Sequence, residues 1–283
     1  MTNAYADLTT LKSTGVLNIS GTGYDTRLRE LLEAASRLID RYCNRHFWAL
    51  HTTRKFDGDG ADNLLVPDLL SVTALKTHDD KDRTFETTWA ATDYLLYPAN
   101  AEPTKPWGRP YSRVLVDVEA GNEDVFTTGR QTVQIEGAWG FRDLTEDSGA
   151  DINEGAQYSA SDTTLTVTDG SKFAVGETIL IESEQLYITA ISTNDLTVER
   201  GVNGTTGAAH ADGTDISTYR YPEEVAEACL LQTSRLWKRK DSGFADSVGL
   251  PQTGTFKVYR GLDPDVRHLL SPYRKPPTGG MGW

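Results

Sequence analysis

Apolar residues recur every three or four positions in two long stretches of the chain, the spacing of a helix that buries one face. The first stretch covers residues 25–45 and the second covers 221–240. A shorter helix is expected over 263–270, because Asp263 can cap it and Pro264 fits its first turn. Each helix should therefore pack its apolar face on another element.

Between the helices the pattern changes to the two-residue alternation of β-strands. Short strands are expected at 51–56, 63–66, 70–77, 93–97, 113–118 and 131–136. Four or five more are expected within 154–215, where Thr, Ser and Gly are frequent and Asn203-Gly204 marks a tight turn. This second group should form a small barrel or sandwich.

Charge also separates the second group of strands from the rest. The whole chain has 28 Lys and Arg against 41 Asp and Glu, a net charge of −13. Residues 154–215 hold two basic residues, Lys172 and Arg200, against ten acidic ones, so this stretch alone carries −8. We interpret it as a separate module. The acidity of the whole chain is unsuited to nucleic acid, because phosphate binding needs clustered Lys and Arg.

Several function classes are disfavoured by what the sequence lacks. It has no run of about 18 apolar residues, so we expect no membrane span, and its N-terminus does not have the pattern of a secretory signal. Two cysteines, Cys43 and Cys229, are too few for a disulfide framework or a four-ligand zinc site. No HExxH or GxSxG motif occurs. We therefore expect no enzymatic activity, cofactor or metal.

Two alternatives stay open. A carbohydrate- or receptor-binding module is suggested by the acidic β module of 154–215 together with Trp89, Trp107 and Trp139, if these side chains are exposed in a groove. A hydrolase could use Glu182 and Glu184, which alternate along a strand and so share a face, although a turn at this point favours solvent exposure of both.

Short motifs follow one another along the chain: LIDRYCNRHF (38–47), FDGDG (56–60) with LVPDLLSVTAL (65–75), QIEGAWGF (134–141), YPEEV (221–225) and LLSPYR (269–274). Their joint order resembles the head–tail connector (adaptor) proteins of tailed bacteriophages, over about 1–152 and 217–283. Residues between these ranges depart from the family. There, GETILIESEQLY (176–187) and VERGVNGTTG (198–207) resemble small modules inserted into various phage structural proteins.

The resemblance implies an α+β fold, in which a small α-helical bundle core with short β-strands is interrupted by an inserted all-β domain. The connector domain would then have two parts, 1–152 and 218–274. The inserted acidic β domain would cover 153–217, and a flexible C-terminal arm would cover 275–283.

The resemblance also implies a structural role in the virion. Such proteins form a ring, usually of twelve copies, beneath the portal protein, where they join the DNA-filled head to the tail and extend the DNA channel. The implied partners are the portal, a downstream tail or stopper protein, and further copies of the same chain. Genomic DNA would pass through the lumen without sequence-specific binding. Assembly would take place in the host bacterial cytoplasm, and the final location would be the neck of the virion.

Candidate contact residues follow from the same resemblance. The C-terminal arm occupies the place of a portal-binding segment, and its candidates are Tyr273, Arg274, Lys275, Met281 and Trp283. Charged and aromatic residues of the two long helices are candidates for the interface between subunits: Arg37, Arg41, Trp237 and Arg239.

Overall fold

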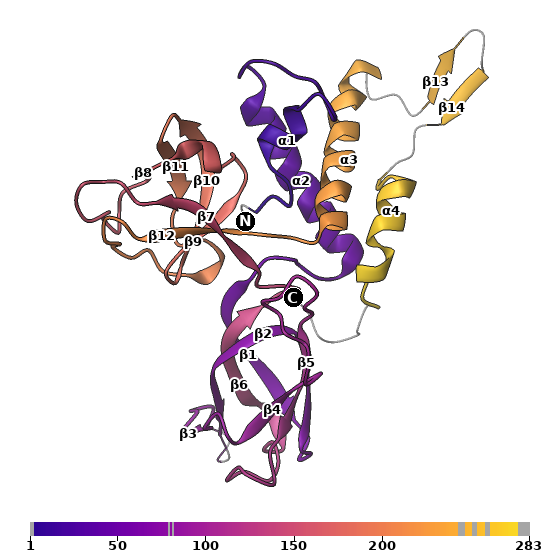
Figure 1. Cartoon of the computed structure of the whole chain (residues 1–283). Helices are drawn as coiled ribbons and strands as arrows, with labels where there is room; N and C mark the ends of the chain where they lie inside the picture. The colour runs from indigo at the N-terminus through magenta and orange to yellow at the C-terminus, as the bar shows by residue number, and fades with distance from the viewer. Residues whose placement is uncertain are drawn as a thin grey trace. The chain divides into compact units, whose positions relative to one another are not determined.

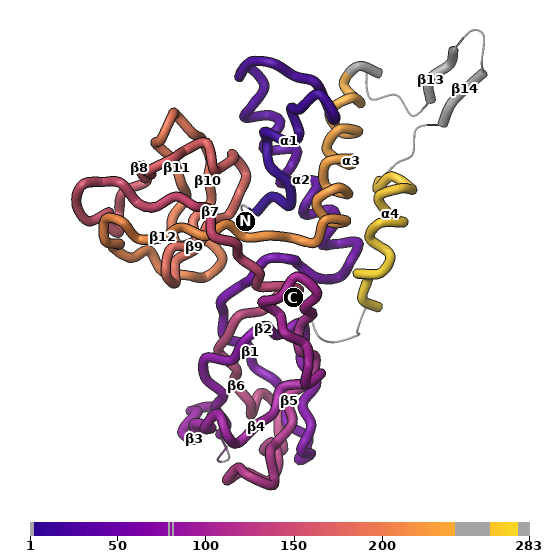
Figure 2. The backbone as a smooth tube through the Cα atoms, in the orientation of Figure 1, coloured from indigo at the N-terminus to yellow at the C-terminus, as the bar shows by residue number. Residues whose placement is uncertain are grey.

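The structure is a computed structural model of the 283-residue chain, and it describes residues 3–78, 80, 82–242, 247–250, 254–257 and 261–276. The chain divides into two compact units. Unit 1 comprises Met1–Asn44 and Thr145–Pro277, and unit 2 comprises Arg45–Leu144 and Thr278–Trp283. Figure 1 shows the elements of both units, and Figure 2 follows the same backbone as a tube.

Unit 2 is built on one antiparallel sheet (Figure 1). Its strands are β1 (Leu50–Gly58), β2 (Asn63–Thr77), β3 (Thr87–Thr88), β4 (Tyr94–Tyr97), β5 (Tyr111–Val116) and β6 (Gly129–Trp139). Their order is β1-β6-β2-β5-β4, with β3 paired to β2. The core of this unit centres on Trp139, whose side chain is fully buried and donates from Nε1 to the Thr52 carbonyl at 2.9 Å.

Strand β2 is longer than the sequence pattern predicts, because it continues through Pro67. The pairing register of β2 with β5 shifts between Leu65 and Leu69, which is the signature of a bulge. A proline is tolerated at such a point because no regular ladder hydrogen bond is needed there. The two short strands expected at 63–66 and 70–77 are therefore one strand.

The helices all lie in unit 1 within the described part of the chain. They are α1 (Leu8–Lys12), α2 (Asp25–Cys43), α3 (Glu223–Lys238) and α4 (Pro264–Leu270). Helices α2 and α3 pack side by side and antiparallel, because Tyr24, just before α2, meets Trp237 near the end of α3 with ring centres 5.2 Å apart. Helix α4 packs on α3, and the Asp263 side chain caps it as predicted. None of the helices described has a stretch long and apolar enough to cross a membrane.

Unit 1 also holds a second antiparallel sheet. Its strands are β7 (Thr145–Asp151), β8 (Thr164–Thr166), β9 (Thr178–Ile181), β10 (Glu184–Ser192), β11 (Asp195–Glu199) and β12 (Asp215–Tyr219), in the order β7-β12-β9-β10-β11-β8. Its two edges are joined, because the Thr168 N–H donates to the Asp151 carbonyl at 3.0 Å and the Asn153 N–H to the Thr166 carbonyl at 2.9 Å. The sheet thus closes around its own apolar core. A separate hairpin, β13 (Ser247–Leu250) with β14 (Gly254–Lys257), follows α3.

The second sheet is bound to the helical part of unit 1 by polar contacts. The Tyr187 hydroxyl on β10 donates to Glu33 on α2 at 2.9 Å. The Thr178 hydroxyl on β9 donates to Asn3 at 2.9 Å, and the Leu8 N–H donates to the carbonyl of Val175 at 2.9 Å. The sheet begins at Thr145 and ends at Tyr219, beyond both expected limits of the inserted module, 153 and 217. The division into a connector domain and an inserted domain stays a prediction.

The expected fold class, with a helical bundle as its core, is wrong. The described part of the chain is mostly β, with two six-stranded antiparallel sheets, and 23% of it is helix. The sequence pattern predicts the strands of 51–141 one at a time, as short additions to the helices. They instead pair over long sequence distances and enclose a core of their own, which includes Leu69, Ile135 and Trp139.

Candidate functional site

Three segments far apart in the sequence meet at the C-terminal end of α2. The Tyr273 hydroxyl, after α4, donates to Glu224 Oε2 on α3 at 2.8 Å. The Arg274 guanidinium lies 5.4 Å from the centre of the Tyr42 ring on α2, within the range of a cation–π contact. The Tyr42 hydroxyl in turn lies 3.5 Å from the Arg267 carbonyl on α4.

The segment after α4 also completes the end of α2. The last carbonyls of a helix have no partner within the helix. Here the Lys275 N–H donates to the Cys43 carbonyl at 2.9 Å. Asn44, in the left-handed conformation at φ 51°, donates from its side chain to the Lys275 carbonyl at 2.9 Å. The base of the predicted C-terminal arm is therefore fixed to α2.

We call this region the helix-end surface, formed by Tyr42, Glu224, Arg267, Tyr273 and Arg274, together with Arg41, which lies next to Tyr42 in the last turn of α2. Its three arginine side chains lie on exposed residues of a chain whose net charge is −13. Guanidinium groups bind carboxylates and stack on aromatic rings, so this surface suits a partner that is acidic or aromatic. Arg267 was not predicted as a site residue, because nothing local in the sequence indicates that α4 folds back beside α2 and α3.

The five predicted portal-binding residues divide into two groups. Tyr273, Arg274 and Lys275 lie together at the end of α2, as described above. Met281 and Trp283 lie outside the described residues. That any of them binds the portal stays a prediction.

The four predicted subunit-interface residues do not form one patch. Arg41 belongs to the helix-end surface. Arg37 lies mostly within the fold, where its Nε donates to Asp40 Oδ2 at 2.7 Å and its guanidinium lies over the Tyr5 ring. Trp237 and Arg239 lie at the opposite end of the antiparallel helix pair, where Trp237 packs on Tyr24.

Asp40 is held inside unit 1 between Arg37 and the Tyr5 hydroxyl, which donates to it. Burial raises the pKa of Asp40 from its ordinary value of 3.8 to about 6, although Arg37 and Tyr5 both act to lower it. This carboxyl therefore changes charge near neutral pH inside the packed helical part of the molecule.

The second sheet contains a buried ionic cluster centred on Glu184. This carboxylate is fully buried and accepts two hydrogen bonds from Arg200, Nε to Oε1 at 2.7 Å and the terminal nitrogen to Oε2 at 2.6 Å. It also accepts from the backbone N–H of Gly201 and of Ala208, both at 3.0 Å. Burial alone would raise the pKa of Glu184, but these bonds and His210 hold it at about 2.

His210 links the two glutamates that the hydrolase alternative invoked. Its Nδ1 lies 2.7 Å from Glu182 Oε2, and its Nε2 lies 2.8 Å from Glu184 Oε2. Glu182 is exposed at the β9–β10 turn, so the expectation of solvent exposure is right for Glu182 and wrong for Glu184. Both oxygens of Glu184 are occupied by internal donors. The cluster therefore fixes the loop 200–210 to the sheet and leaves Glu184 no free lone pair facing solvent.

The three tryptophans of the carbohydrate-binding alternative do not form an exposed groove. Trp139 is fully buried in the core of unit 2. Trp89 is 5% exposed and stacks on Phe126 with ring centres 5.0 Å apart. Only Trp107, at 74% exposure, is open to a partner among these three.

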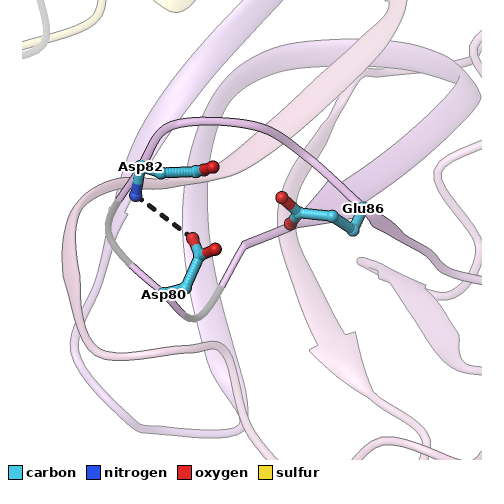
Figure 3. A group of neighbouring side chains, drawn as sticks. All are labelled: Asp80, Asp82 and Glu86. Carbon is cyan, nitrogen blue, oxygen red and sulfur yellow. Dashed lines mark hydrogen bonds between the residues drawn. The ribbon is translucent and has the colours of Figure 1, made fainter.

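One group of acidic side chains in unit 2 has the spacing of a cation site. Ligand oxygens of Asp80, Asp82 and Glu86 all lie within 4.8 Å of one another, and Figure 3 shows them around one turn. All three residues are exposed, and the Asp82 N–H donates to Asp80 at 3.1 Å. Exposed carboxylates of a turn commonly gather without an ion, so we assign no metal to them.

No protein-family model and no curated protein matches the sequence. Among solved structures, the protein is similar to a chain from the neck of an empty GTA particle computed with C6 symmetry, at 12% identity and a TM-score of 0.44. The match covers 99% of this chain and 98% of that chain. At this TM-score the two folds agree only in broad outline, so the likeness by itself assigns no function.

Proposed function

We propose that the chain is a structural protein of the neck of a tailed-phage particle, where it joins the head to the tail. The observation that carries the proposal is the helix-end surface. Three of the connector-like motifs, LIDRYCNRHF, YPEEV and LLSPYR, contribute Tyr42, Glu224 and Tyr273 to it. These motifs lie far apart in the sequence and still contact one another, so they form one structural unit. This supports the interpretation that their joint order is that of a head–tail connector protein.

In this role several copies form a ring beneath the portal protein, and twelve is the number that the resemblance implies. The helix-end surface and the segment 275–283 bind the portal, and another face of the ring binds a downstream tail or stopper protein. Weak contacts repeated around a ring add through multivalency, so no single contact needs to be strong. The origin of the GTA neck chain is compatible with this proposal and adds no weight to it.

DNA passes through the lumen of the proposed ring without sequence-specific contacts. The chain has 41 acidic against 28 basic residues, and a net negative charge disfavours tight binding of phosphates. The protein assembles in the host cytoplasm and acts without catalysis.

The location of the chain in purified particles tests this proposal. Fab fragments raised against the full-length protein, carrying gold, should label the one vertex where the tail joins the head. Label at the tail tip would instead support the receptor-binding alternative. Label on the capsid faces, or an absence of the chain from the particles, would reject the neck assignment.

A further inference from the structure

Trp107 is the most exposed of the large apolar side chains in the described part of the chain, at 74%. It lies in the proline-rich loop between β4 and β5 in unit 2, and its indole N–H donates to Glu102 Oε2 at 3.1 Å. A large aromatic side chain in water gains free energy when a partner covers it, and tryptophan is the residue type most enriched among interface anchors.

The loop that carries Trp107 is held by its own hydrogen bonds. The Lys105 N–H donates to the Glu102 carbonyl at 3.0 Å, the Gly108 N–H to the Lys105 carbonyl at 2.9 Å, and the Arg109 N–H to the Ala101 carbonyl at 2.8 Å. Gly108 is required, because a Cβ there would come within 1.9 Å of the Glu102 carbonyl oxygen. Trp107 is thus presented in one geometry, which reduces the entropy lost when it binds.

Unit 1 contains a cavity of about 230 Å³. It lies between the segment before α1, strand β9 and the start of α3. Its apolar lining includes Ala4, Ala226 and Leu230. Its volume is below that of most drug-sized ligand pockets, about 300–1,000 Å³, and is suited to a single side chain.

The charged groups of the cavity complement those of the loop. Asp7 and Glu177 line the cavity opposite one cation, Arg220, so its lining has an excess of one negative charge, although Asp7 also accepts from Thr10 and Glu177 from Ala174. Trp107 is flanked by Lys105 and Arg109, both exposed, and bonds Glu102, so the loop has an excess of one positive charge. The Arg220 guanidinium, bonded to Glu177 at 3.1 Å and to Glu146 at 2.9 Å, is also a group that an indole face attracts.

We propose that Trp107 of one copy inserts into this cavity of a second copy. The inference rests on the proposed ring, because a closed ring needs two different surfaces on each copy, one that projects and one that receives it. The loop supplies the first surface and the cavity supplies the second. Each copy then binds one neighbour on either side.

Cross-linking of the full-length chain tests the contact. A variant with Pro106→Cys beside the tryptophan and Thr10→Cys at the cavity should be joined head to tail by a short bis-maleimide, which gives a ladder of multimers on a denaturing gel. Cys43 and Cys229 are buried and should not react in the folded protein. Variants with only one of the two new cysteines should give dimers at most.

Adding Trp107→Ala to the double-cysteine variant should lower the yield of the ladder by roughly tenfold or more, the loss typical of an aromatic anchor. Ala226→Phe, which fills the cavity, should also lower the yield of the ladder, because Trp107 of the neighbouring copy can no longer enter. Leu65→Ala is the matched control, because Leu65 is an apolar residue of strand β2 in unit 2 that is 55% exposed and does not belong to the loop, and it should leave the ladder unchanged. Unchanged thermal melts would show that the variants are folded.

The absence of a ladder would overturn the proposal, and so would a ladder that survives both Trp107→Ala and Ala226→Phe. A cross-linked product that remains a monomer would also overturn it, because Trp107 would then lie in the cavity of its own chain. The test is separate from that of the proposed function. Particles labelled at the neck without a Trp107-dependent ladder would keep the neck assignment and reject the contact. A Trp107-dependent ladder from a chain absent from the neck would keep the contact and reject the neck assignment.

Discussion

Glu184 and Arg200 form a two-pronged ion pair inside the second sheet, with nitrogen–oxygen distances of 2.7 and 2.6 Å. The carboxylate is fully buried and the arginine side chain is 9% exposed. A pair of this kind stabilises the fold only while both charges are present, because removal of one partner leaves the other charge buried without compensation.

Glu184→Gln should therefore lower the free energy of unfolding of the chain by about 3–5 kcal/mol, measured by urea denaturation. Glu182→Gln is the matched control, because Glu182 contacts the same His210 from the exposed side of the cluster. Its loss should stay below about 1 kcal/mol. Equal losses for the two variants would contradict the assignment of Glu184 as the centre of the cluster.

The raised pKa of Asp40 predicts that stability falls as the pH rises. Because its native pKa is about 6 and its ordinary value is 3.8, the folded state binds this proton more tightly than the unfolded state does. The stabilisation is complete below an ordinary carboxyl pKa, about 4, and is lost as the pH rises through 6, with a total of roughly 3 kcal/mol.

Asp40→Asn should remove this part of the pH dependence in urea denaturation series at several values of pH. Burial also raises the pKa of Glu177, so Glu177→Gln should be measured in parallel to separate the two contributions. A pH dependence that persists unchanged in Asp40→Asn would show that another group is responsible.

The hydrogen bond between Tyr187 and Glu33 should contribute to the free energy of unfolding, because it joins the second sheet to α2. The Tyr187 side chain is fully buried, and its hydroxyl donates to a carboxylate. Tyr187→Phe should cost about 1.5–3 kcal/mol, the range for a hydrogen bond to a charged group. Tyr24→Phe removes a hydroxyl from a residue that is 54% exposed and should change stability by less than about 0.5 kcal/mol. No difference between these two variants would contradict the role of the contact.

Truncation of the chain after Lys275 should leave unit 1 folded and weaken portal binding. This variant keeps the bond from the Lys275 N–H to the Cys43 carbonyl and the bond from the Asn44 side-chain amide to the Lys275 carbonyl, so the end of α2 stays capped. Co-sedimentation with the portal compares the truncated and full-length chains, and thermal melts verify the fold. Equal portal binding by both would reject the predicted role of this segment.

The long helices could be predicted closely from the sequence. The spacing of apolar residues predicted helices at 25–45 and 221–240, and the structure has them at Asp25–Cys43 and Glu223–Lys238. Such spacing is local, so one stretch of chain contains all the information that it needs. The pairing of strands is not local. Leu50 and Leu69 both lie opposite Trp139, and nothing near any of the three residues in the chain indicates this.

The ionic cluster of the second sheet also depends on contacts between distant residues, which the local sequence does not indicate. Glu184 follows a turn, which favoured exposure, but it is the first residue of β10 and points into the sheet. Its partners, Arg200 and His210, come from a loop much later in the sequence. The one available signal was that Arg200 is one of only two basic residues in an acidic stretch of chain.

Negative-stain imaging of the purified chain mixed with its portal protein tests the central claim most directly. The mixture matters more than the chain alone, because contacts repeated around a ring strengthen one another only when a template gathers the copies. If the chain is a neck protein, it should form a ring stacked coaxially on the portal. Single copies of the chain beside bare portal particles would contradict it.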